Sequence, residues 1–213
     1  MHLTHRSGQT LLELVIGVGI IVVTTLTTTT IIILTLTAGQ YSQARVEAAN
    51  LAREGAEVVR SLRDSNWLKI DQNVTDPAGS ANPADLVKWD DNPYYPVGIG
   101  GYCPFSGGSG SCPNSGTLIP NFDPATGWNL LTASAGTGRI KLVDGLYYTQ
   151  GTCPAGSSCT NSRFSRTVTI EKKTDSTITL GPVEYLDVTS TVTWQEKNGQ
   201  KFSTVQTRLY DWK

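Results

Sequence analysis

The chain has 213 residues, enough for one domain with an appendage, and its 17 Lys and Arg nearly balance its 18 Asp and Glu. These charges are scattered, so no basic surface makes nucleic acid the primary partner. The only histidines, His2 and His5, precede a long apolar run, which leaves the main body without a histidine base or zinc ligand. We therefore expect neither an enzyme nor a cofactor.

The first predicted element is a transmembrane helix over residues 11–36, because no charged side chain occurs between Leu14 and Ala44. As a helix, residues 11–36 extend about 39 Å at about 1.5 Å per residue. That length exceeds a bilayer core of about 30 Å. Threonines lower the hydrophobicity, although each hydroxyl can return a hydrogen bond to the backbone one turn earlier. Arg6 and the initiator amine precede the span and favour a cytoplasmic N-terminus.

One acid, Glu13, interrupts this apolar run. A carboxylate in hydrocarbon is costly, marks a function by default and calls for a partner. A lone anchor offers it no counter-charge, whereas a bundle of related helices does. A secretory signal peptide is the alternative reading, but its apolar region is usually only about 7 to 15 residues long. The best cleavage site of that kind, at residues 37–39, also comes late.

The second half of the same helix is predicted to be amphipathic, and we expect one helix over residues 9–68. No proline occurs between Gln9 and Asp64. Charged residues lie off the apolar stripe, with Arg53 and Glu57, and Arg60 and Asp64, at i, i+4 spacing. The stripe is expected to cover the protein's own sheet. Its small or apolar members are Ala44, Ala48, Leu51, Gly55, Val58 and Leu62.

Residues 69–213 are predicted to form a β-rich head, which gives an α+β fold with a long N-terminal helix packed on a C-terminal antiparallel sheet. Residues 98–138 are rich in Gly, Ser and Pro and are expected to form long loops. Asn198-Gly199 favours a tight hairpin in an antiparallel meander. The strands are expected within GRIKLVDGLYYTQ (138–150), FSRTVTIEKK (164–173), EYLDVTSTVTW (184–194) and KFSTVQTRLYDW (201–212).

The head contains four cysteines, which allow three disulfide pairings. We expect Cys103 to pair with Cys112 and Cys153 with Cys159, because each pair brackets a loop rich in Gly and Ser. Each bridge would stabilise the head by about 2 to 3 kcal/mol. A four-cysteine zinc site is the alternative, but its gaps exceed the usual two to four residues. Disulfides are favoured if the head is extracellular.

Two further groups have alternative readings. Asp90, Asp91 and Asn92 supply oxygens suited to calcium, although no full EF-hand spacing is present and a solvated turn fits as well. The aromatic residues either form a binding patch for a sugar or a surface, or pack in the core, as large aromatics usually do. These aromatics are Trp89, Tyr94, Tyr95, Tyr102 and Phe105.

The stretch SGQTLLELVIGVGIIVV resembles the N-terminal processing and methylation segment of type IV prepilins and type II secretion pseudopilins. The resemblance implies a leader of residues 1–8 that ends at Gly8. Gln9 then becomes the new N-terminus and a site of N-methylation, although the family most often has Phe there. Glu13 becomes the fifth residue, whose carboxylate pairs with the α-amino group of a neighbouring subunit and sets the register.

The same resemblance implies a lollipop fold and a structural role, as a minor pilin or pseudopilin of a type IV pilus or secretion filament. The implied partners are a prepilin peptidase, an assembly platform protein with its ATPase, the membrane, and other pilin subunits through helix packing. The protein would span the inner membrane once and then enter an extracellular filament. One alternative is a non-polymerising single-pass protein that displays an adhesive or ligand-binding head; another is a stalked extracellular enzyme.

Overall fold

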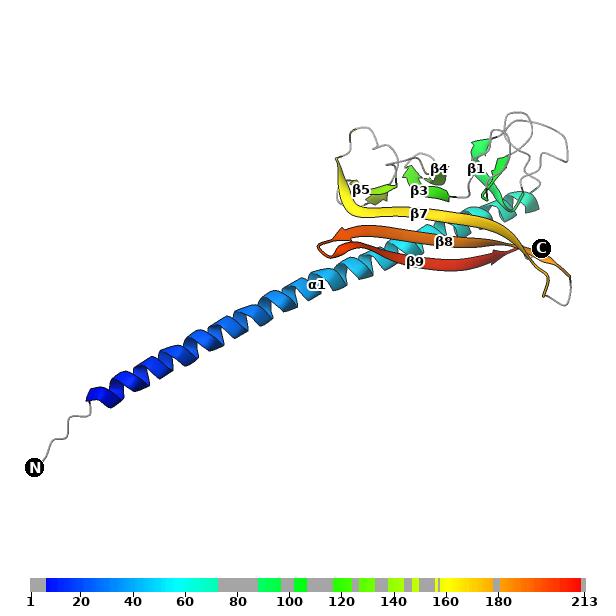
Figure 1. The fold of residues 1–213 in the computed structure, drawn as a ribbon. Coiled ribbons are helices and arrows are strands. Elements are labelled where there is room, and N and C mark those ends of the chain that lie inside the picture. The colour runs from blue at the N-terminus through cyan, green and yellow to red at the C-terminus, as the bar shows by residue number, and fades with distance from the viewer. Residues whose placement is uncertain are drawn as a thin grey trace, which may run out of the picture. The chain divides into compact units, whose positions relative to one another are not determined.

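The computed structural model describes residues 7–72, 88–96, 102–106, 117–123, 127–132, 138–143, 147–149, 156, 158–177 and 181–211. The chain divides into two compact units, residues 1–46 and residues 47–213. Helix α1, Ser7–Asp71, passes through both units (Figure 1). The helix predicted over residues 9–68 is therefore confirmed to within three residues at each end.

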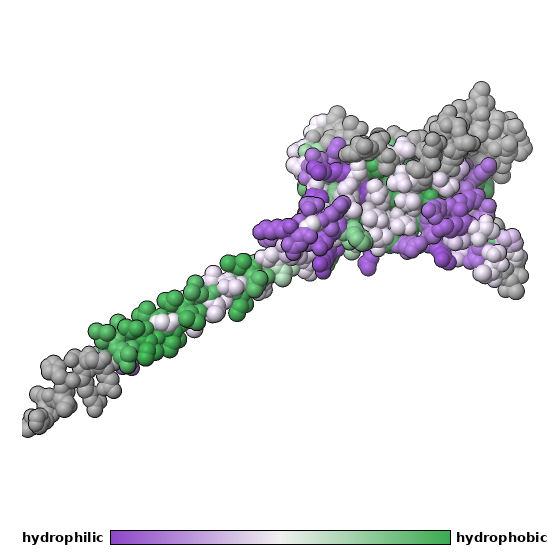
Figure 2. Space-filling view, viewed as in Figure 1, coloured by the Kyte–Doolittle hydropathy of each residue, from purple (hydrophilic) through white to green (hydrophobic). Residues whose placement is uncertain are grey.

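In the first unit, the large apolar side chains of α1 are exposed, and no other part of the described chain buries them. Figure 2 shows them as one hydrophobic stretch of the helix surface. The polar groups within this stretch are satisfied locally, because every threonine from 24 to 37 donates its hydroxyl to a carbonyl three or four residues earlier. Examples are Thr28 to the Thr24 carbonyl at 2.7 Å and Thr37 to the Ile33 carbonyl at 2.7 Å. The expected return of hydroxyls to the backbone is confirmed, and it lowers the cost of placing threonine in hydrocarbon.

In the second unit, the remaining part of α1 buries the predicted stripe. Ala48, Leu51, Gly55, Val58 and Leu62 are all buried. Their spacing puts them on one side of the helix, and the neighbouring positions on that side are also apolar. The helix thus contributes one apolar face to the core. That core joins Val58, Val59, Leu62 and Trp67 to Trp89, Phe105, Leu118, Leu130, Val168, Ile170, Leu186, Val188 and Leu209.

The sheet is antiparallel throughout and is built around one long strand, β7 (Cys159–Asp175). Along one side β7 pairs with β8 (Val183–Glu196), which pairs with β9 (Gly199–Tyr210). Its other side is shared by β5 (Arg139–Val143) and β3 (Thr117–Asp123). Further out, β4 (Gly127–Thr132) pairs with β3 and β6 (Tyr147–Thr149) with β5. A separate two-stranded sheet joins β1 (Asp91–Pro96) to β2 (Tyr102–Pro104).

The strand expected within residues 184–194 is present as part of β8, and its side chains alternate as one buried sheet face requires. Val188, Val192 and Trp194 are buried, whereas the threonines between them are only half-buried. The predicted hairpin is also present, with Glu196 paired to Gly199 across a two-residue turn. Gly199 has φ 107, a backbone conformation that favours glycine.

The expectation of long loops over residues 98–138 is wrong, because β2, β3 and β4 lie within that range. The meander holds only for β7, β8 and β9, since β3 and β5 both return to β7. Strands β3 and β4 contain Pro120 and two asparagines, residues that are depleted in strands. Tertiary pairing compensates: the Asn121 amide donates to the Asn129 side-chain oxygen at 3.1 Å, and both residues are buried.

Candidate membrane-spanning and processing segment

The residues of the expected processing site lie at the start of α1. Gly8 and Gln9 have helical backbone, and the side chain of Gln9 is not among those that the structure describes. Glu13 follows one turn later with an exposed side chain, and it forms no ion pair with any residue whose side chain the structure describes. The segment therefore presents one carboxylate on an otherwise uncharged and exposed helical surface.

This helix is long and apolar enough to cross a membrane. From Leu11 onward it contains an 18-residue window of mean hydropathy 2.1, none of which is buried within the protein. An exposed surface of this kind is unfavourable in water, since apolar area costs about 25 cal/mol per Å². The segment thus requires either lipid or other helices around it.

The second half of α1 is fixed to the sheet by a buried arginine. Arg166 on β7 is fully buried, and its Nη1 lies 3.2 Å from a Glu54 carboxylate oxygen and donates to the Leu51 carbonyl at 3.1 Å. Burial lowers the pKa of Arg166, while the adjacent Glu54 carboxylate opposes that shift. A second pair, Arg163 with Glu47 at 3.7 Å, is more exposed. Two cations of β7 thus meet two acids of α1.

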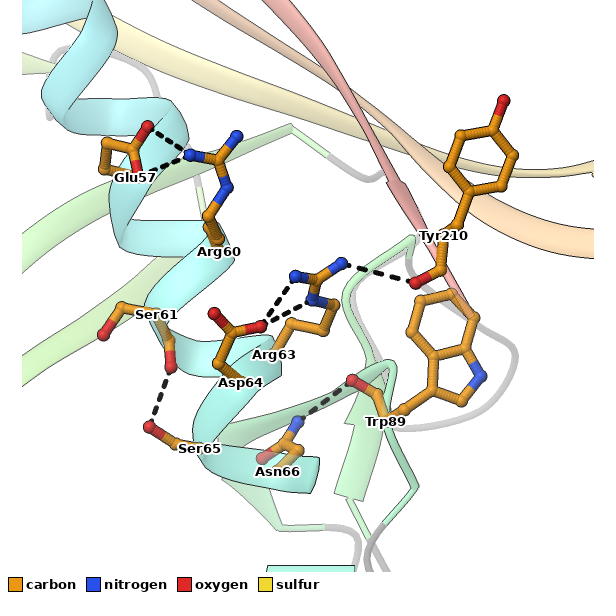
Figure 3. A network of polar contacts seen from close by, with 9 residues as sticks. All are labelled: Glu57, Arg60, Ser61, Arg63, Asp64, Ser65, Asn66, Trp89 and Tyr210. Carbon is orange, nitrogen blue, oxygen red and sulfur yellow. Dashed lines mark hydrogen bonds and ion pairs between the residues drawn. The ribbon is translucent and has the colours of Figure 1, made fainter. Parts of the chain in front are cut away.

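The ion pairs along the exposed side of α1 differ from the i, i+4 pairs expected. Arg60 pairs with Glu57 at 2.6 Å, and Arg63 pairs with Asp64 at 2.7 Å (Figure 3). The reason is visible in Figure 3: the Arg63 guanidinium reaches toward the sheet and donates to the Tyr210 carbonyl at 3.3 Å. Asp64 therefore pairs with the adjacent Arg63 rather than with Arg60.

The last turns of α1 hold the start of β1. The buried Asn66 amide donates to the Asp91 carbonyl at 2.6 Å. It also donates to the Trp89 carbonyl at 3.4 Å (Figure 3). Trp89 and Phe105 are core residues, so packing is confirmed for these two aromatics. The side chains of Tyr94, Tyr95 and Tyr102 lie outside the described ones.

The calcium candidates already have protein partners. The Asp90 carboxylate binds Lys172 Nζ at 3.0 Å, and the Asp91 carboxylate accepts the Lys88 N–H at 2.6 Å. Burial lowers the pKa of Lys172, but its contacts with Glu184 and Asp90 outweigh that effect and raise it. The Asn92 side chain lies outside the described ones. Within the described side chains, no group of three His, Cys, Asp or Glu is placed to hold a metal.

Cys103 and Cys159 are both disulfide-bonded. Cys112 and Cys153 lie outside the described residues, so the expected pairing stays a prediction.

The sequence analysis did not predict the buried contact between Arg166 and Glu54. A signal for Arg166 was present, because its position places it on the same strand face as Phe164, Val168 and Ile170, which are all buried.

Comparison with known proteins gives no relative: the chain matches no family model, no curated protein and no solved structure.

Proposed function

We propose that this chain is a pilin-like structural subunit, a minor pilin or pseudopilin, which is cut after Gly8 and enters a filament through its N-terminal helix. The observation that carries the proposal is the single carboxylate of Glu13 on an uncharged apolar helix, with no ion pair among the described side chains. A carboxylate in hydrocarbon is unfavourable, by about 2.5 kcal/mol or more at the bilayer centre, and Glu13 is the third residue of the predicted span of residues 11–36. A chain that retains such a group needs a cation for it.

Cleavage after Gly8 supplies that cation. The new α-amino group at Gln9 is positively charged below its pKa of about 8. In a bundle of such helices, the amine of one subunit meets the Glu13 carboxylate of the next. A neighbour out of register would leave both charges unpaired in an apolar environment, at a cost of about 3 to 5 kcal/mol. The pair therefore selects one axial register as the helices pack.

The amphipathic second half of α1 fits the same role. It belongs to the second unit and buries its apolar stripe on the sheet, so the head is attached to a helix that continues into the span. In this proposal the head is extracellular, the N-terminus begins in the cytoplasm, and the exposed apolar surface passes from lipid to the filament interior. A prepilin peptidase and an assembly platform with its ATPase would be the partners.

Mass spectrometry of the protein extracted from the membrane of its own cells tests the processing step. A mature N-terminus at Gln9 supports the proposal. An intact Met1, or a cut near Gly39, would instead support a single-pass display protein or a secreted one.

Substitution of Glu13 tests its role. Glu13→Ala should leave membrane insertion intact, because the apolar span is unchanged, and should reduce the amount of protein recovered in filaments by at least about tenfold, equivalent to about 1.4 kcal/mol. Leu14→Ala is a matched control, since it shortens an adjacent, similarly exposed side chain without changing charge. Equal filament incorporation of Glu13→Ala and wild type would refute the register role.

A further inference from the structure

The border strand β9 has a free edge. It pairs with β8 along its 12 residues, from Gly199–Glu196 to Tyr210–Tyr185, with no shift of register. Among the described strands, β8 is its one neighbour, and Figure 1 shows β9 at the border of the sheet. A long, regular edge strand is a template on which another strand can pair.

The backbone groups that face this edge can be assigned. The Asp211 N–H donates to the Glu184 carbonyl at 2.9 Å, which makes Glu184 and Asp211 a hydrogen-bonded pair. Such pairs alternate along an antiparallel ladder, so the odd-numbered residues of β9 bond to β8 and the even-numbered ones face outward. Tyr210 is even-numbered, so its carbonyl should face away from β8. It does accept a hydrogen bond from elsewhere, namely from Arg63 on α1 (Figure 3).

Arg63 covers only the Tyr210 end of the edge. The outward-facing backbone groups between Gly199 and Tyr210 belong to Gln200, Phe202, Thr204, Gln206 and Arg208. Two of the usual protective devices of an edge strand are missing from β9, which contains no proline and no bulge. Its Phe202 side chain is 73% exposed beside the open backbone groups.

The charge of β9 indicates what kind of strand would pair there. The strand contains two cations, Lys201 and Arg208, and no carboxylate. Neither cation forms an ion pair within 4 Å among the described residues. Arg208 lies over the Tyr185 ring at 5.3 Å and interacts electrostatically with Asp187 on β8. Opposite charges on adjacent strands stabilise pairing, and like charges destabilise it. Two copies of β9 would add two cations and no carboxylate to each face of the joined sheet, because Lys201 and Arg208 lie on opposite faces, and this argues against self-pairing.

We propose that the free edge of β9 binds an extended segment with acidic side chains, contributed by a neighbouring, non-identical subunit of the filament. This inference rests on the proposed function, because assembly holds the heads of neighbouring subunits close together and raises their effective concentration. Main-chain hydrogen bonds to the open groups between Gln200 and Arg208 provide the attachment. The acidic side chains, placed near Lys201 and Arg208, provide the specificity.

Site-specific photo-crosslinking of the full-length protein in its own cells tests the proposal. A photoreactive amino acid at Gln206 lies at the free edge, whereas one at Thr189, its cross-strand partner on β8, is the matched control. We expect adducts at Gln206 at least about tenfold more abundant than at Thr189. Peptide mapping should place them on an acidic, non-helical segment of a co-assembled subunit.

A proline at the edge separates strand pairing from simple proximity. Thr204→Pro removes an outward N–H without removing a backbone bond to β8, so the head should keep its unfolding midpoint while the Gln206 adduct falls about tenfold, equivalent to about 1.4 kcal/mol. It also removes the exposed hydroxyl contact of Thr204 with Thr191 on β8 at 3.2 Å, which the control Thr204→Val removes as well. Thr204→Val keeps the N–H and should retain the adduct.

Three outcomes would overturn the inference: no excess of adducts at Gln206, adducts that are insensitive to Thr204→Pro in a folded protein, or adducts to β9 of a second copy. The N-terminus is read in the same samples. A Gln9 terminus without edge adducts refutes the docking surface and leaves the proposed function intact, whereas a retained leader refutes the proposed function itself.

Discussion

Gly55 shows how closely α1 approaches the sheet. A Cβ at this position would meet the Ser190 hydroxyl oxygen and would lie 3.2 Å from both Arg166 Cδ and Val168 Cγ2. Gly55 therefore costs helix propensity, about 1 kcal/mol relative to alanine, in exchange for contact between helix and strands. The residue is part of the apolar stripe because of its small size rather than its hydrophobicity.

We predict that Gly55→Ala destabilises the protein by about 1 to 3 kcal/mol, although alanine is the better helix former. The added methyl group has to displace atoms of two strands in a closely packed core. Urea unfolding of the detergent-solubilised protein measures the change. Gly39→Ala on the same helix is the control, because nothing lies within 4 Å of a Cβ there, and it should be neutral or slightly stabilising.

Arg166 and Glu54 should respond unequally to substitution. Arg166 is fully buried, whereas the Glu54 side chain is 35% exposed at 3.2 Å from it. Glu54→Ala leaves a buried guanidinium without its carboxylate and should cost about 3 kcal/mol. Arg166→Met replaces the cation with an apolar side chain that matches the aliphatic part of arginine, leaves Glu54 with access to water, and should cost less.

The double variant with Glu54→Ala and Arg166→Met decides whether the unequal costs arise from the charge. It should be more stable than Glu54→Ala alone, because the buried cation that lost the Glu54 carboxylate is gone. Denaturant midpoints of the four proteins give the coupling free energy directly. Additive effects would mean that the pair contributes no more than packing does.

At the scale of elements, the sequence predicts α1 and the β7–β8–β9 ladder well. Val188, Val192 and Trp194 repeat at the period of a strand, and the apolar stripe repeats at the period of a helix, so local pattern and burial agree. Strands β3 and β4 could not be predicted in this way. They depend on the pairing of β3 with β7, on the pairing of β4 with β3 and on the Asn121–Asn129 contact, none of which leaves a periodic signal in the sequence. The burial of Arg166 was not predicted because the residue is charged, although its position places it on the buried face of β7.

The outer side of the three-stranded ladder carries a polar network that spans all three strands. The Asp187 carboxylate on β8 accepts hydrogen bonds from Lys173 on β7 and from Gln206 on β9, both at 2.8 Å. These two hydrogen bonds hold the pKa of Asp187 below its usual value. Lys173 also contacts Glu171 at 2.8 Å, and the pKa of Lys173 is raised by the two carboxylates.

The lowered pKa of Asp187 predicts a stability that falls with acid. Above the unfolded carboxyl pKa of about 3.9, Asp187 is ionised in both states and its contacts stabilise the fold fully. As the pH falls through the lower folded pKa, the carboxyl takes up a proton and that stabilisation is lost. Asp187→Asn should therefore make the unfolding midpoint less dependent on pH below about pH 4. Glu171→Gln, whose side chain is 61% exposed, should change that slope less.

At the scale of the whole molecule, the two units face different solvents in the proposed role. The apolar surface of residues 11–36 needs lipid or other helices, whereas the stripe between Ala48 and Leu62 is already satisfied by the sheet. Helix α1 is continuous from Ser7 to Asp71. Truncation before this stripe should therefore leave a folded head, whereas truncation after it should not.

We predict that a fragment of residues 47–213 is soluble and folds cooperatively, while a fragment of residues 69–213 aggregates. The first keeps the whole second unit, including the α1 residues of the core. The second lacks Val58, Val59, Leu62 and Trp67, and it uncovers sheet residues such as Val168 and Val188, which are fully buried in the complete chain. Size-exclusion chromatography and circular dichroism at neutral pH distinguish the two cases. A monomeric, folded 69–213 fragment would mean that the sheet, rather than its contact with the helix, supplies most of the stability of the head, since exposed apolar patches of this kind otherwise drive association.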